Sequence, residues 1–131
     1  MLRALAATTA LLAGCWETCP PPAEPQIDFV VIVDVPIADG QYLHAALFNP
    51  LGAWIDSRES EVASMWNGTL GHCDGEQQQS GQFKVITWLN MSSVYYEHEP
   101  AAGDVQAMDL IDVTCANDAC YPARDAHITL R

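Results

Sequence analysis

Basic residues are scarce in this chain, and so are long hydrophobic runs. Five lysines and arginines stand against 17 aspartates and glutamates, which gives a formal net charge of −12 at pH 7. A surface of this sign repels phosphate backbones and anionic lipid head groups, so nucleic-acid binding is excluded and no polybasic membrane contact is expected. No apolar run approaches the roughly 20 residues that a membrane-spanning helix needs. The composition, with 50% hydrophobic residues, therefore predicts a globular domain.

Motifs for catalysis and for transition-metal binding are also missing. The chain has no Gly-x-Ser-x-Gly elbow, no Cys-x2-Cys pair, and no His-x-His or His-x3-His pair. These motifs supply an activated nucleophile and closely spaced metal ligands. We therefore expect neither an enzyme nor a cofactor. A small hydrolase that uses two of the many carboxylates is the weakest alternative, because a domain of this length leaves little room for a substrate cleft.

The first residues have the layout of a secretory signal: Arg3 precedes an apolar run from Ala4 to Leu12. The run ends in Leu12-Ala13-Gly14-Cys15, which resembles the lipobox of bacterial lipoproteins. In that family the signal is cut before the cysteine, and the cysteine is lipidated. The resemblance implies that residues 1–14 are removed and that the Cys15 sulfur carries a diacylglycerol, usually with a further acyl chain on the amine.

The same resemblance implies an address in the bacterial cell envelope. Two or more acyl chains anchor a protein stably, since each buried methylene contributes about 0.8 kcal/mol. Trp16, not aspartate, follows the cysteine, and the sorting rule of enteric bacteria then implies the outer membrane, on its periplasmic or surface face. We expect membrane contact through lipidated Cys15. Residues 15–26, with four prolines, are expected to form an extended tether.

The remaining cysteines are an even set in an exported chain, which favours disulfides. Cys115 and Cys120 flank a turn-forming Ala-Asn-Asp-Ala sequence, so we expect them to pair, which leaves Cys19 with Cys73. Four cysteines allow three pairings, and a free Cys19 on the tether stays open. A zinc site from the four thiols is the rival interpretation, which the spacing and an oxidising compartment disfavour.

Residues 27–131 are expected to form one all-β domain, a small antiparallel β-sandwich of the immunoglobulin-like or transthyretin-like kind. Runs of β-branched and alternating residues predict the strands, namely 27–35, 41–48, 62–70, 83–91, 105–115 and 126–130. The first two are expected to form a hairpin around Asp39-Gly40.

Residues 53–82 allow two interpretations. Asp56 with Glu59 three positions later is typical of a helix N-terminus, so a short helix competes with the preferred strand. Trp88 lies on the strand face opposite Phe83, and burial of its ring is favoured over exposure.

The segment Gly81 to Trp88, Gly-Gln-Phe-Lys-Val-Ile-Thr-Trp, resembles a strand that recurs in transthyretin-like and carboxypeptidase-regulatory-like β-sandwiches. The resemblance covers roughly residues 27–115 and implies an accessory or binding module without catalytic machinery. Some exported sandwiches of this kind carry a calcium loop, whose acidic glycine-rich core is missing here. The weak candidates for calcium ligands are Glu97, Glu99 and Asp104.

These patterns together favour a non-catalytic structural or binding role at a membrane surface. The partner would be a protein or a carbohydrate, which the sequence does not name. A calcium-dependent binding module that uses the acidic loop 97–104 is the alternative.

Overall fold

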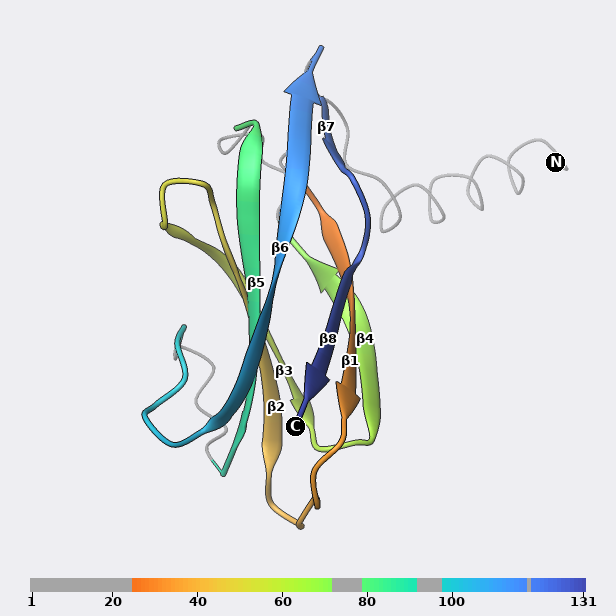
Figure 1. Ribbon diagram of the computed structural model, residues 1–131, viewed down its shortest axis with the longest axis vertical. Coiled ribbons are helices and arrows are strands. Elements are labelled where there is room, and N and C mark those ends of the chain that lie inside the picture. Colours follow the sequence, from red (N-terminus) through yellow and green to blue (C-terminus); the bar gives the residue numbers. More distant parts are fainter. Residues whose placement is uncertain (1–24, 72–78, 92–97, 118) are drawn as a thin grey trace, which may run out of the picture.

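The computed structural model describes residues 25–71, 79–91, 98–117 and 119–131. In this part of the chain the regular structure is entirely β-strand, and the strands pack as two sheets (Figure 1). The described strands are β1 (Ile27–Val33), β2 (Tyr42–Phe48), β3 (Trp54–Glu61), β4 (Met65–Leu70), β5 (Gly81–Asn90), β6 (Val105–Ala116), β7 (Ala119–Pro122) and β8 (Ala126–Leu130). The all-β sandwich predicted from the sequence is confirmed.

The smaller sheet has the strand order β4-β1-β8, and the larger has the order β3-β2-β5-β6-β7. Every pairing is antiparallel except that of β1 with β8, which is parallel. The expectation of a purely antiparallel sandwich is wrong in this one pairing. Its cause is the crossing at residues 123–125, after which β8 continues in the direction of β7 but joins the other sheet beside β1 (Figure 1).

The hydrophobic core lies between the two sheets. Both sheets contribute fully buried side chains to it: Ile27, Phe29, Val31, Leu43, Leu47, Leu70, Phe83, Val85, Ile111 and Leu130. Successive side chains of a strand point to opposite faces, so alternate residues of β1 and β5 meet in this layer. A second, smaller buried group consists of Ala46, Phe48 and Trp88 and is separate from the main core.

The hairpin predicted over residues 27–48 is wrong, because β1 and β2 belong to different sheets. The segment between them crosses one end of the sandwich, and backbone hydrogen bonds fix both of its ends. Asp34 N donates to Leu130 O at 2.8 Å, and Gln41 O accepts from Val62 N at 3.1 Å. The Asp-Gly dipeptide indicates a local turn, but it does not specify which strand lies alongside.

Residues 54–61 form β3, and the short helix suggested by Asp56 and Glu59 is wrong. The Asp56 carboxylate accepts from Arg58 Nη1 at 2.8 Å through Oδ1 and from the backbone N of Gly71 at 2.9 Å through Oδ2. The side chain that would cap a helix instead ties β3 to the end of β4. Among the described residues no helix is long and apolar enough to cross a membrane.

The four-residue strand β7 was not predicted, because it is too short to show an alternating pattern. Cys115 and Cys120 are joined by a disulfide, as their spacing predicts, and they lie directly opposite each other in β6 and β7. Asn117 in the intervening turn has a φ of 55°, a conformation that asparagine tolerates better than most residues. Cys15, Cys19 and Cys73 lie outside the described residues.

Candidate functional site

Polar and aromatic side chains gather on the outer face of the five-stranded sheet. Two adjacent rungs cross β3, β2 and β5, namely Glu59–His44–Trp88 and Glu61–Tyr42–Asn90. Their neighbours in sequence, Leu43 and Leu89, point into the core, so both rungs face away from the small sheet. We call six residues of this face the outer-face cluster: His44, Trp54, Glu59, Trp88, Asn90 and His98.

The His44 ring lies at the centre of the outer-face cluster and is almost fully buried. It stacks on Trp88 with ring centroids 5.0 Å apart and an interplanar angle of 7°. Its Nε2 is 2.8 Å from Asn90 Oδ1, and its Nδ1 is 3.8 Å from Glu59 Oε2. Both ring nitrogens therefore face groups of the protein, so the ring is a buried structural element of this face and not an exposed base.

A second stack lies further along the same face. The rings of Trp54 and His98 are 4.0 Å apart with an interplanar angle of 22°, and Trp54 Nε1 donates to Ser57 Oγ at 2.7 Å. Because His98 contacts β3 while Val105 begins β6, residues 98–104 must run along the outer face between them (Figure 1). The outer-face cluster is thus built from three strands and one connecting segment.

Three polar atoms in the outer-face cluster are buried without a hydrogen-bond partner among the described residues: Glu59 Oε2, Trp88 Nε1 and His98 Nδ1. A buried unsatisfied group costs about 1–3 kcal/mol. Glu59 Oε2 still lies within ion-pair distance of His44 Nδ1, and the Trp88 ring stacks on the same histidine. Because the three atoms are buried, a ligand cannot reach them without a rearrangement of this face.

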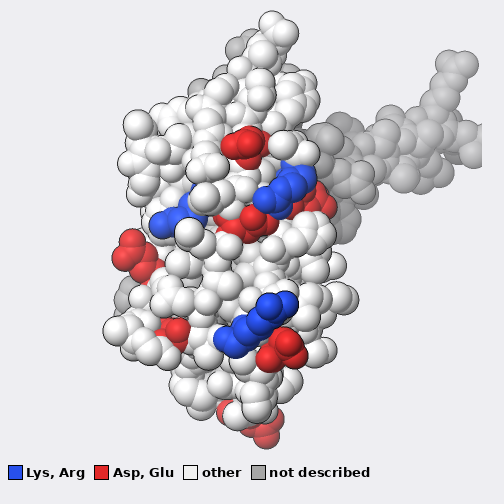
Figure 2. All heavy atoms as spheres, in the orientation of Figure 1, with Lys and Arg blue, Asp and Glu red and all other residues white. Residues whose placement is uncertain are grey.

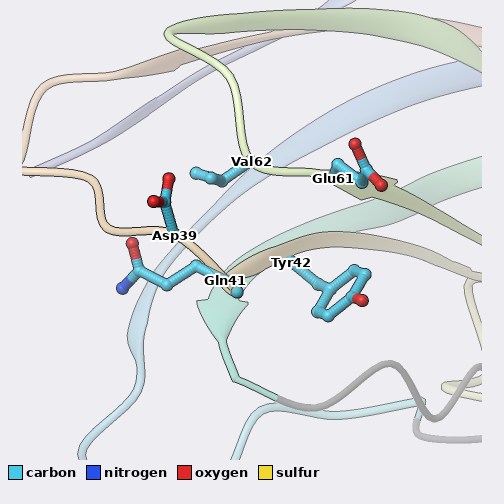
Figure 3. Close-up of a pocket in the computed structure, with 6 residues that line it drawn as sticks. Asp39, Gln41, Tyr42, Glu61 and Val62 are labelled. Carbon is cyan, nitrogen blue, oxygen red and sulfur yellow. The ribbon is translucent and has the colours of Figure 1, made fainter.

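A shallow hollow of about 250 Å³ adjoins the second rung, at the ends of β2 and β3. Its lining residues are Asp39, Gly40, Gln41, Tyr42, Glu61 and Val62. Figure 3 shows the Asp39 side chain directed toward Val62, whereas the Glu61 carboxylate lies apart from it. The two carboxylates do not converge, so the hollow lacks the geometry of a cation site.

The same outer face also exposes large apolar side chains. Met108 and Leu110 in β6 and Tyr121 in β7 are 58%, 40% and 64% exposed. Met108 lies opposite Ile86, and Leu110 lies opposite Lys84, whose ammonium sits 4.6 Å from the Phe48 ring centroid. Figure 2 shows a largely uncharged surface with acidic and basic groups interspersed. Large exposed apolar side chains on so acidic a protein mark a surface suited to a partner.

The calcium candidates do not come together in the described residues. The Asp104 carboxylate accepts from the backbone N of Ala101 at 2.9 Å and so closes its own turn. Glu99 is exposed, and Glu97 lies outside the described residues. No group of three or more His, Cys, Asp or Glu residues suited to a metal occurs in the part of the chain that the structure describes.

Sequence reasoning placed Trp88 correctly as a buried ring but missed most of its partners. Sequence reasoning assigned no role to His44, His98 or Trp54, and it considered Glu59 only as part of a helix N-terminus. The only local signal is that His44, Ala46 and Phe48 share one face of β2. Nothing near them in the sequence indicates that residues 98–104 return to the same face.

Comparison with protein-family models, curated proteins and solved structures found no match for this chain.

Proposed function

We propose that this is a lipid-anchored protein of the bacterial cell envelope whose β-sandwich binds another protein and performs no chemistry. The anchor rests on the sequence Leu12-Ala13-Gly14-Cys15 and its apolar leader. The binding role rests on one structural observation, the exposed apolar side chains on the outer face of the large sheet. The partner contacts this face beside the outer-face cluster.

The composition of the face supports a protein partner. Protein interfaces are enriched in aromatic residues and methionine and depleted of charge at their centre. Met108 and Tyr121 belong to the enriched residue types, and they are exposed together with Leu110 on a chain whose net charge is −12. The enclosed position of His44, with both ring nitrogens facing protein groups, supports a role in binding and not in proton transfer.

Photo-cross-linking in cells tests the binding surface. A photoreactive side chain in place of Tyr121 is expected to form a discrete adduct of higher mass on the cell envelope. The same group in place of Ile32, which is 41% exposed on the opposite sheet, is the matched control. Adducts from position 32 alone, or from neither position, would refute the assignment. If the purified domain bound peptidoglycan and no protein, the partner would be a carbohydrate and not a protein.

Phase partition tests the anchor separately. The protein with Cys15 is expected in the detergent phase of a membrane extract. Cys15→Ser removes the sulfur that carries the lipid, so that variant is expected to leave the detergent phase. Equal partition of both proteins would show that residue 15 carries no anchor.

A further inference from the structure

Within the residues that the structure describes, the two sheets have four edge strands, and three of these are protected against pairing with another chain. β3 carries four charged residues, Asp56, Arg58, Glu59 and Glu61. β7 has four residues and ends at Pro122. At β8, the backbone N of His127 donates to Asp109 Oδ2 at 3.0 Å. Charge, shortness, proline and coverage are the usual ways in which proteins block an edge.

The fourth edge strand, β4, has none of these protections. Its sequence, Met-Trp-Asn-Gly-Thr-Leu, contains no charge and no proline. Met65, Asn67 and Gly68 are exposed, and among the described strands β1 is its only neighbour in the sheet. An exposed, uncharged edge is a template for adding a strand.

The register shows which backbone groups this edge presents. Val33 N donates to Ser64 O, so residues 33 and 64 form a hydrogen-bonded antiparallel pair. Such pairs alternate along the ladder, so Trp66, Gly68 and Leu70 bond to β1. The N–H and C=O groups of Met65, Asn67 and Thr69 therefore point away from the sheet. No hydrogen bond engages these groups within the described residues.

We infer that β4 is a homodimerisation edge, on which β4 of a second copy of this chain pairs antiparallel. The three outward residues are spaced evenly about Asn67, so a two-fold axis at Asn67 pairs it with Asn67 of the second copy. The same axis places Met65 opposite Thr69 twice. The edge is thus complementary to itself, as a closed two-fold interface requires.

Charge favours a second copy at this edge over the edge strand β3, which carries four charged residues. Two chains of net charge −12 repel each other, and like charges directly opposite across strands destabilise a pairing. At β4 every pair in the proposed register is uncharged. A single pair of short strands buries less than the roughly 1,200 Å² of a stable interface, so we expect a weak, concentration-dependent dimer. The inference is independent of the proposed binding surface, which lies on the other sheet.

Substitution of Asn67 by residues of opposite charge tests the two-fold axis. Asn67→Asp and Asn67→Lys each place like charges opposite each other in a homodimer, so each variant alone is expected to sediment as a monomer up to about 1 mM. Mixed in equal amounts they pair opposite charges and are expected to dimerise at least as well as the original chain. A full chain that stays monomeric at about 1 mM, or a mixture that stays monomeric, would overturn the inference.

Amide-resolved hydrogen exchange of the full chain locates the contact. The amides of Met65, Asn67 and Thr69 are expected to exchange more slowly as the protein concentration rises. The amides of Trp66, Gly68 and Leu70 are internal controls, because they already bond to β1 and should not respond. A dimer whose formation leaves the three outward amides unprotected uses another surface, and the assignment of β4 is then wrong.

Discussion

The carboxylate of Asp109 accepts a hydrogen bond from each terminal guanidinium nitrogen of Arg124, with Nη1–Oδ2 at 2.6 Å and Nη2–Oδ1 at 2.8 Å. Oδ2 also accepts from the backbone N of His127 at 3.0 Å. Asp109 belongs to β6 of the large sheet, and His127 belongs to β8 of the small sheet. The hydrogen bond from His127 to Asp109 therefore joins the two sheets, and Arg124 binds the same carboxylate from the segment that crosses between them.

The Asp109–Arg124 pair predicts a loss of stability in acid. The pKa of Asp109 is lowered from 3.8 to about 2, mainly by the hydrogen bond from Arg124 and also by the backbone hydrogen bond from His127. Desolvation of the carboxylate acts in the opposite direction but is outweighed. A lowered carboxyl pKa stabilises the fold fully above pH 3.8, and this stability is lost as the pH falls toward about 2. Since Arg124 is half exposed, screening limits the contribution to about 1 kcal/mol.

Asp109→Asn should therefore lower the free energy of unfolding by about 1 kcal/mol at pH 7 and by much less at pH 2. Urea unfolding at both pH values measures this difference. Asp34→Asn, which changes an exposed carboxylate on the β1–β2 crossing, is the control. An equal effect of Asp109→Asn at the two pH values would contradict the role of its ionised form.

Thr87 carries a hydroxyl that the core does not use. The side chain is fully buried between the sheets, and Oγ1 has no hydrogen-bond partner in the part of the chain described. Thr87→Val keeps the shape and removes the unsatisfied group, so it should stabilise the protein by about 1 kcal/mol. Thermal unfolding measures the gain, with the exposed Thr114→Val as a neutral control. A lower melting temperature would mean that the hydroxyl is hydrogen-bonded after all.

Gly71 occupies a position that only glycine fits. Its φ is 131°, and an added Cβ would overlap with the carbonyl oxygen of Pro25. Gly71→Ala should cost more than about 2 kcal/mol, since backbone strain and steric overlap add. Gly52→Ala is the matched variant, because Gly52 also has a positive φ of 85° but nothing within 4 Å of its Cβ. Equal costs for the two variants would show that the contact with Pro25 is unimportant.

The disulfide holds the short strand β7 against β6. The paired Ala variant Cys115→Ala, Cys120→Ala should lose about 2 kcal/mol, the value that the chain-entropy model gives for so short a loop. Exchange of the β7 amides should rise along with this loss. Substitution is preferable to a reducing agent, which would also break any bond between Cys19 and Cys73. Unchanged stability and unchanged β7 exchange would show that β7 is held without the disulfide.

The strands that were predicted from the sequence are those whose burial follows a simple local pattern. β1 is apolar throughout its middle, and β5 alternates, because each has a face in the core. β3 was missed because a bulge between Leu47 and Phe48 interrupts its register, so that Ile55 and Asp56 are both buried in succession. The strands that pair with β1 are β4 and β8, which lie far from it in sequence, so no local pattern could predict these pairings.

The outer-face cluster was even less accessible to sequence reasoning. His44 and Trp88 stack because β2 and β5 are adjacent, and Trp54 meets His98 because residues 98–104 return to that face. The acidic residues around 97–104 suggested calcium ligands, yet Asp104 bonds to its own turn. A candidate site made by strand neighbours becomes visible only when the topology is known.

The intact mass of the protein extracted from membranes tests the lipid anchor most directly. The account predicts a chain that begins at Cys15, with the mass of two or three acyl chains added. Such a mass would place the sandwich at the membrane surface through its N-terminus. A mass that retains residues 1–14, or one that begins at Cys15 without lipid, would contradict the account.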